Sequence, residues 1–159
     1  MANEKNKDFN AMFKKKTDMP KTQIITDKNT IKKYGGKKMF LAPPCYYNDI
    51  MKTIPYGKII TSDLIRNYLA KNNNTDFTDP LTSGIFISIC AWASHQREED
   101  KIPYWRTLKA NGELNPKYPG GIDMQKKLLE SEGHIIIQKG RKNIKYYVQN
   151  YENFLFELI

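Results

Sequence analysis

The pattern of apolar and polar positions predicts two short amphipathic helices near the start of the compact part of the chain. Residues 46–54 carry apolar side chains at helical spacing, and Pro55 ends this stretch. A short extended piece then leads to an N-cap at Thr61 or Ser62, after which apolar residues again recur every three or four positions. The asparagine run 72–74 stops this second helix.

A third helix is predicted to begin at Asp79. Asp79 is a good N-cap, Pro80 suits the first helical position, and the chain stays apolar from Ile85 to Ala93. The β-branched residues in this stretch could indicate a strand, but its length and its alanines favour a helix. Together with the preceding helix and the short polar turn between them, it resembles a helix-turn-helix pair, although any helical bundle produces such pairs.

The last third of the chain predicts a fourth helix and a hairpin. Residues 122–129 show helical spacing, and Gly133 suits a C-cap. Residues 134–148 contain two β-rich runs about a glycine-containing turn and hold no acidic residue. A basic hairpin after a helical pair is typical of a wing that lies along a phosphate backbone, although an ordinary solvated hairpin explains the same pattern. Residues 151–159 predict a short helix or a docking strand. The fold class expected is mainly α with a small β part, arranged as a winged helix-turn-helix with a basic C-terminal hairpin.

Charge divides the chain more clearly than length does. The 159 residues are enough for one domain with a core of its own. Residues 1–40 hold 11 lysines against four acidic residues, so they carry +7 of the formal charge of +9. We therefore expect a basic, partly irregular N-terminal extension (1–42) and a winged-helix domain (43–159). Such an extension either binds a polyanion or only keeps a protein soluble, and the sequence favours neither.

Several classes of protein and site lack support in the sequence. No apolar run approaches the roughly 18 residues of a membrane span, and the first residues lack the apolar core of a secretory signal. We therefore expect a cytoplasmic protein without membrane contact, in which Cys45 and Cys90 are reduced and buried. No glycine pattern for phosphate binding and no paired metal-ligand motif is present, so neither a cofactor nor a metal is expected. His95 and His134 are interpreted as surface or capping residues.

Five short segments occur in an order that indicates a family. "IPYGKIITSDLI" is followed by the third predicted helix, by "IPYWR", by "NGEL" and "YPGG", and by "QKKLLESEG". These segments lie within residues 44–134, and their order and spacing resemble the DNA-binding C-terminal domain of the O6-alkylguanine-DNA alkyltransferases. The resemblance implies a winged helix-turn-helix that enters the DNA minor groove and flips a damaged guanine into a pocket.

The reactive segment departs from that family. The enzymes have Pro-Cys-His-Arg, in which the cysteine accepts the alkyl group and the histidine, linked through water to a later glutamate, activates it. This chain has Pro103, Tyr104, Trp105 and Arg106, and Glu132 stands where the glutamate is expected. A phenol with a pKa near 10 is a poor substitute for a thiolate. We therefore predict no catalytic residue, and the chain is more similar to the alkyltransferase-like proteins, which lack the cysteine and bind alkylated DNA without repairing it.

Two further positions differ from the enzymes. The tyrosine that rotates a phosphate aligns with about Ser62, and the arginine that replaces the flipped base falls near Ser83 and Gly84. Without that arginine, unstacking a base is less well compensated. We therefore predict a non-enzymatic protein that binds double-stranded DNA, and possible recognition of alkylated guanine follows from the resemblance.

Three alternatives stay open. A winged-helix module could bind undamaged DNA or a protein partner, with the ancestral pocket filled by aromatic residues. An enzyme of different chemistry could use Tyr104, Arg106 and Glu132, although this set includes no histidine, metal or activated nucleophile. Tyr104 and Trp105 could also simply pack into the space of a lost active site, with Arg106 paired to Glu132 or to a loop carbonyl.

The prediction assigns residues to two sets and expects a monomer whose other partners are repair or regulatory proteins. The groove-facing helix comprises residues 80–90. The DNA-binding set is Ser62, Thr82, Ser83, Arg106, Lys139, Arg141, Lys142 and Lys145, and the pocket set is Pro103, Tyr104, Trp105 and Glu132.

Overall fold

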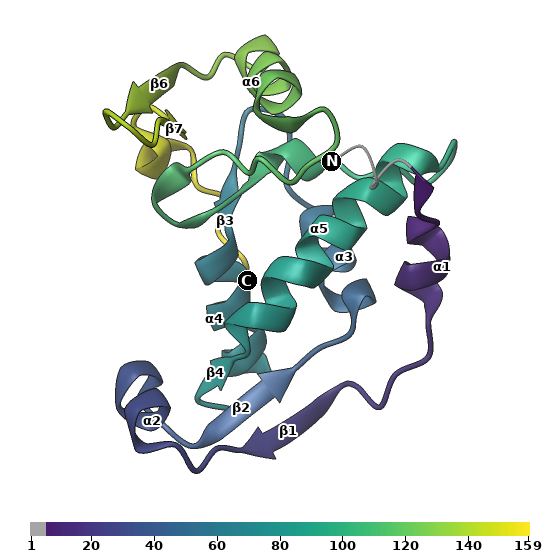
Figure 1. Ribbon diagram of the computed structural model, residues 1–159, viewed down its shortest axis with the longest axis vertical. Coiled ribbons are helices and arrows are strands. Elements are labelled where there is room, and N and C mark those ends of the chain that lie inside the picture. The colour runs from purple at the N-terminus through teal and green to yellow at the C-terminus, as the bar shows by residue number, and fades with distance from the viewer. Residues whose placement is uncertain (1–5) are drawn as a thin grey trace.

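The computed structural model describes residues 6–159, which form a mostly helical fold with small sheets and a C-terminal hairpin (Figure 1). The α-helices in this range are α1 (Phe9–Lys14), α2 (Lys28–Tyr34), α3 (Pro44–Met51), α4 (Ser62–Asn72), α5 (Pro80–Gln96) and α6 (Gly121–Ser131). The strands are β1 (Lys21–Ile24), β2 (Lys38–Leu41), β3 (Ile60–Thr61), β4 (Phe77–Thr78), β5 (Thr107–Leu108), β6 (Ile136–Lys139) and β7 (Lys145–Val148). None of the described helices is long and apolar enough to cross a membrane.

The four helices predicted from the apolar pattern are confirmed as α3, α4, α5 and α6. Asp79 caps α5, because its carboxylate accepts hydrogen bonds from the backbone N–H groups of Leu81 and Thr82. Gly133 follows α6 with a φ of +91°, which is the left-handed conformation expected of a glycine at this position. The predicted hairpin is the antiparallel pair β6–β7.

Helix α5 runs through the middle of the molecule, and each of its sides has a different environment (Figure 1). Ile87, Cys90 and Ala91 face the main core, which α3 and α4 complete. The side with Ile89 and Ala93 packs against α1. The third side is exposed to solvent, so α5 packs against the protein on two sides and is open on the third.

The N-terminal segment contains more regular structure than its sequence pattern predicts. Strand β2 pairs antiparallel with β1 and parallel with β4, and helix α1 packs against α5. The pattern is weak because these strands are short and β1 is exposed along its whole length. Phe40 and Ala42 belong to the same core cluster as α4 and α5. The domain boundary at residue 42 stays a prediction.

The C-terminal residues combine the two forms that the sequence predicts for them. A single 3₁₀ turn spans Tyr151–Phe154, and Leu155 then forms a parallel bridge with Ile59. The N–H of Phe156 donates to the carbonyl of Ile59 at 2.8 Å. This contact fixes the chain end beside β3.

Candidate nucleic-acid interface

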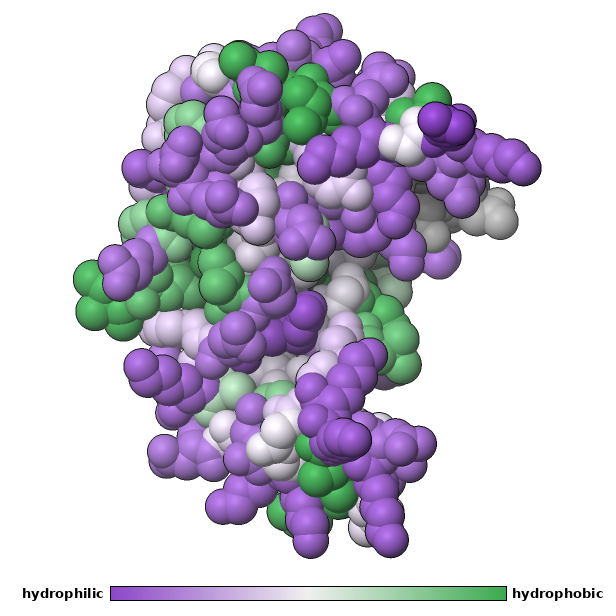
Figure 2. All heavy atoms as spheres, turned by 90° about the vertical axis from the view of Figure 1, so that its left-hand side faces the viewer, coloured by the Kyte–Doolittle hydropathy of each residue, from purple (hydrophilic) through white to green (hydrophobic). Residues whose placement is uncertain are grey.

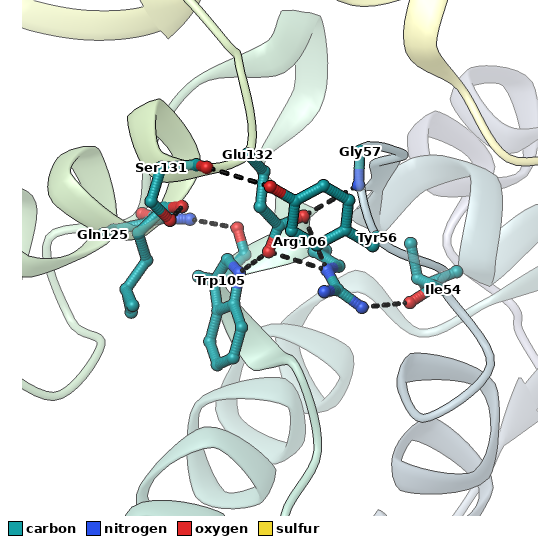
Figure 3. A network of polar contacts seen from close by, with 9 residues as sticks. Ile54, Tyr56, Gly57, Trp105, Arg106, Gln125, Ser131 and Glu132 are labelled. Carbon is teal, nitrogen blue, oxygen red and sulfur yellow. Dashed lines mark hydrogen bonds and ion pairs between the residues drawn. The ribbon is translucent and has the colours of Figure 1, made fainter.

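The "IPYWR" segment is held in the interior by the strand that follows it. Tyr104–Arg106 form one 3₁₀ turn, and β5 then pairs in parallel with β3. The pairing brings Arg106 beside the turn that precedes β3, and the end of α6 brings Glu132 to the same place (Figure 3).

Glu132 is the centre of a buried polar network (Figure 3). Trp105 Nε1 donates to its Oε2 at 2.7 Å, and the backbone N–H of Gly57 donates to its Oε1 at 2.9 Å. Arg106 Nε donates to both carboxylate oxygens, at 2.9 and 3.1 Å. Arg106 Nη1 donates to the carbonyl of Ile54 at 2.8 Å. The carboxylate therefore joins three parts of the chain.

This environment keeps the Glu132 carboxylate ionised, and both of its oxygens already accept hydrogen bonds. Its side chain is 4% exposed and that of Arg106 is 13% exposed. Burial alone would raise the pKa of Glu132, but the hydrogen bonds from Arg106, Gly57 and Trp105 outweigh burial and lower it. The sequence predicts Arg106 at the DNA backbone, whereas the structure uses its guanidinium in an internal ion pair and on a loop carbonyl. The packing alternative left open for this residue is therefore the one observed.

Tyr104 is a buried, neutral phenol. It is 6% exposed, and its ring makes edge contacts with Trp105 and Tyr118 at centroid distances of 5.4 and 5.5 Å. Burial raises the pKa of the phenol. Tyr104 is therefore unsuited to act as a nucleophile near neutral pH.

The two cysteines do not replace the missing acceptor. Cys90 is buried, its thiol donates to the carbonyl of Pro44 at 3.3 Å, and burial raises its pKa. Cys45 is exposed, so the prediction that both cysteines are buried is wrong for it. Cys45 lies in the first turn of α3, whose buried side is formed by Tyr47, Ile50 and Met51.

The prediction that Ser83 contacts DNA is wrong. Its side chain is fully buried, and its hydroxyl contacts the hydroxyl of Tyr47 at 2.9 Å and donates to the carbonyl of Asp79. It therefore faces the core and cannot contact DNA in this fold. Thr82 is half-buried and donates to the Asp79 carboxylate at 2.9 Å, and Ser62 is the half-buried first residue of α4.

The exposed side of α5 is apolar at its N-terminal half. Leu81 is 72% and Ile85 is 50% exposed, and Gly84 between them is exposed too. At 3.6 residues per turn, Ser88, Trp92, His95 and Gln96 follow along the same side, but Trp92 is only 5% exposed because the Phe9 ring stacks on it, so this side is covered at Trp92 and open again at His95 and Gln96. We call this side the α5 stripe: Leu81, Gly84, Ile85, Ser88, Trp92, His95 and Gln96.

Two hollows lie at the C-terminal end of α5, and His95 borders both. The first, about 580 Å³, continues the α5 stripe, and the second, about 460 Å³, contains three of the predicted pocket residues. The first is lined by Trp92, His95, Gln96, Pro119, Gly120 and Met124. The second is lined by Lys52, Ser94, His95, Lys101, Ile102, Pro103, Tyr104, Trp105 and Arg106.

The sequence interpretation missed the residues of the first hollow. The available signal was the helical spacing of positions 92, 95 and 96, together with the "YPGG" turn. The Nε1–H of Trp92 donates to the carbonyl of Lys117 at 2.8 Å, which joins α5 to this turn. Glu132 lies outside both hollows, among the groups that hold the second one in shape.

The predicted basic residues of the hairpin are all exposed but differ in their contacts. Lys145 Nζ lies 4.0 Å from a carboxylate oxygen of Glu113, and Lys139 lies over the ring of Tyr147 at 4.9 Å. Arg141 and Lys142 stand in the turn between the strands. The hairpin is attached to the preceding loop, because the N–H of Leu114 donates to the carbonyl of Tyr146 at 2.8 Å.

No three His, Cys, Asp or Glu side chains within residues 6–159 gather closely enough to hold a metal ion. His134 is 4% exposed, its ring makes an edge contact with Phe154 at 4.9 Å, and neither of its nitrogens has a hydrogen-bond partner among the described residues. The interpretation of His134 as a surface or capping residue is therefore wrong.

No protein-family model and no curated protein matches the sequence. Among solved structures, two from S. pombe match: Atl1 in complex with damaged DNA containing O6-carboxymethylguanine, with a TM-score of 0.51, and ATL in complex with DNA, with a TM-score of 0.52. Each match has 22% sequence identity and covers 72% of this chain and 94% of the other. The chain is thus structurally similar to Atl1, an alkyltransferase-like protein, as the sequence resemblance predicts. At this identity the likeness establishes a shared fold.

Proposed function

We propose that this protein binds double-stranded DNA, with α4 and α5 as a helix-turn-helix pair and the β6–β7 hairpin as a wing. The observation that carries the proposal is the fold shared with S. pombe Atl1, 94% of which is covered and which has been crystallised with DNA. The free side of α5 and the basic hairpin support it, because a helix that enters a groove needs one open face and a wing needs positive charge.

The protein acts without alkyl transfer in this proposal. Tyr104 is a buried phenol whose pKa is raised by burial, and it has no adjacent base. The carboxylate of Glu132 is taken up by Trp105, Arg106 and Gly57. Both observations support a role in binding, and Arg106 then holds the pocket segment in place.

Phosphate contacts come from the start of α4 and from the hairpin. Ser62 stands in the first turn of α4, where backbone N–H groups without a side-chain cap favour anions. At the start of α5 the Asp79 carboxylate already accepts the N–H and the hydroxyl of Thr82, so we propose no phosphate contact there. The hairpin contributes Lys139, Arg141, Lys142 and Lys145. The four hairpin cations by themselves predict that log affinity falls against log salt with a slope of about −4.

An altered base is recognised in the first hollow, between Trp92, His95 and Met124. The hollow lies at the C-terminal end of the α5 stripe, and the buried Trp92 separates it from the exposed residues Leu81, Gly84 and Ile85. Its volume of about 580 Å³ lies in the ordinary range for small-ligand sites. The indole of Trp92 and the imidazole of His95 meet edge to face, with ring centroids 5.9 Å apart. Because Trp92 is only 5% exposed and Phe9 stacks on it, the exposed imidazole of His95 is the main aromatic surface offered to a base.

A second candidate is binding of undamaged DNA or of a protein partner. The exposed apolar side chains of Leu81 and Ile85 favour it, because they stand where a lesion-binding relative is expected to insert an arginine. Equal affinity for duplexes with and without a modified guanine would favour this candidate.

The test is a set of fluorescence-anisotropy titrations with one duplex that carries guanine, O6-methylguanine or an abasic site at the same position. Met124→Trp should fill the first hollow and abolish any preference for the modified guanine, because Met124 lines the hollow and is 42% exposed. Met124→Ala is the matched control that leaves the hollow open, and it should keep the preference. Lack of binding by the wild-type protein at low salt would remove the proposal of DNA binding altogether.

A further inference from the structure

The N-terminal segment is attached to both ends of α5. At the C-terminal end, the N–H of Phe9 donates to Gln96 Oε1 at 3.0 Å, and the Phe9 ring stacks on Trp92 at 5.3 Å. At the N-terminal end, β2 pairs with β4, and the N–H of Asp79 donates to the carbonyl of Phe40 at 2.9 Å. The segment between these attachments therefore runs beside the helix that we assign to the DNA groove (Figure 1).

Lysines dominate the part of the chain between the two attachments. Residues 14–41 hold nine lysines and two aspartates. Asp18 is paired with Lys21 at 2.6 Å, and Asp27 accepts hydrogen bonds from Thr30 at the start of α2. All nine lysines are exposed, and we call them the N-terminal basic surface: Lys14, Lys15, Lys16, Lys21, Lys28, Lys32, Lys33, Lys37 and Lys38.

Packing fixes the place of helix α2, which carries Lys28, Lys32 and Lys33. The ring of Tyr34, at the end of α2, stacks on Phe77 of β4 with centroids 4.7 Å apart. One residue, Asp79, separates β4 from α5. Figure 2 shows the end of the molecule that holds α2, β1 and β2, covered mainly by hydrophilic side chains. A segment that only kept the protein soluble would gain nothing from this anchoring to the start of α5.

We infer that the N-terminal basic surface binds the phosphate backbone of the duplex that α5 engages, outside the reach of the hairpin. The partner is identified by charge alone, since lysines contact phosphates without reading sequence. The hairpin and α2 lie at opposite ends of the molecule, with α5 between them (Figure 1). The inference rests on the proposed function and extends the DNA footprint of this chain along the duplex.

The test reverses three charges on α2, with the variant Lys28→Glu, Lys32→Glu and Lys33→Glu. Each lost phosphate contact makes the salt slope less steep by about 0.9, so three contacts change it by about 3 and weaken binding at 0.1 M salt by about two orders of magnitude. The measurement is the affinity for a duplex of about two helical turns over a series of salt concentrations.

A second triple variant keeps the same net charge and serves as the matched control. Lys126 and Lys127 lie on α6, and Lys58 follows Gly57, whose N–H donates to Glu132 at the end of α6. Helix α6 lies at the other end of the molecule from α2 (Figure 1). The control variant is Lys58→Glu, Lys126→Glu and Lys127→Glu. This control should keep the wild-type slope, and both variants should keep the wild-type thermal unfolding temperature. Should unfolding shift, the milder Lys→Gln changes at the three α2 positions give the same test.

Three outcomes separate the inference from the proposed function. A less steep slope for the α2 variant alone supports the inference. An unchanged slope for the α2 variant, or equal changes in both variants, overturns it while DNA binding by the wild type stands. Absence of DNA binding by the wild-type protein overturns the proposed function and the inference with it.

Discussion

Glu132 shows how the role of a single residue changes when its neighbours change. In the family that the sequence resembles, water links the corresponding glutamate to a histidine that activates the nucleophile. Here Trp105 Nε1 donates directly to the Glu132 carboxylate at 2.7 Å. The indole therefore takes the hydrogen-bonding place of the histidine, but unlike an imidazole it cannot accept a proton from a neighbouring nucleophile. Restoring a cysteine at position 104 alone would not rebuild an activated thiolate.

The ion pair with Arg106 should contribute measurably to stability. Glu132→Gln removes the charge that compensates a guanidinium only 13% exposed, so the free energy of unfolding should fall by about 3 kcal/mol. Urea denaturation followed by tryptophan fluorescence measures the change. Glu130→Gln is the control, because Glu130 is exposed on the same helix and should alter stability little. Equal stability of the two variants would show that the pair is not needed.

At the scale of elements, the start of helix α5 is set by a capping residue that can be recognised in the sequence. Asp79 accepts hydrogen bonds from the N–H groups of Leu81 and Thr82 and from the Thr82 hydroxyl. Asp79→Ala leaves these donors without a partner and should lower the free energy of unfolding by about 1 kcal/mol. Chemical denaturation checks this value, and Asp79→Asn should retain most of the stability. A larger loss in Asn than in Ala would contradict the capping role.

Elements with such local signals could be predicted, and elements that depend on distant partners could not. Asp79, Pro80 and Gly133 mark helix ends by their own backbone and side-chain chemistry. Strand β2 gains its place by pairing with β1 and, in Met39↔Phe77 register, with β4, which lies 38 residues away in the sequence, and no local pattern reveals these partners.

Some residues of the candidate site could also be predicted from the sequence, and others could not. The order of segments places Pro103, Tyr104 and Trp105 together, and the structure finds them around one hollow. The internal use of Arg106 follows from three hydrogen bonds of its guanidinium, two to Glu132 and one to the carbonyl of Ile54, which form only in the folded chain. Ser83 was open to a better prediction, because it stands four residues before the core residue Ile87 on the same side of α5.

At the scale of the whole molecule, His134 links stability to pH. Burial lowers its pKa, against the opposing effect of Glu132, and its ring packs on Phe154 in the C-terminal turn. Because the folded pKa lies below that of the unfolded chain, the unfolded state binds more protons, and stability is lost as the pH falls below about 6.5. The free energy of unfolding should therefore decrease between pH 7.5 and 5.5, as urea titrations at each pH would measure.

Two variants assign this pH dependence. His134→Leu keeps an apolar side chain against Phe154 and should flatten the change in stability between pH 7.5 and 5.5. His95→Gln alters the exposed histidine and is the matched control for removal of one imidazole. The assignment fails if His134→Leu retains the full dependence.

The attachment of the N-terminal segment to α5 has a consequence during synthesis. Residues 14–41 leave the ribosome before β4 and α5 exist, and at roughly 5–20 residues per second several seconds pass before Gln96 is added. Until then Phe9, Phe40 and the edge of β2 have no partner and are open to association with other chains. The lysines interspersed among these residues reduce such association in the nascent chain, because like charges repel one another. The lysines that we propose as phosphate contacts in the folded protein thus also oppose aggregation of the incomplete chain.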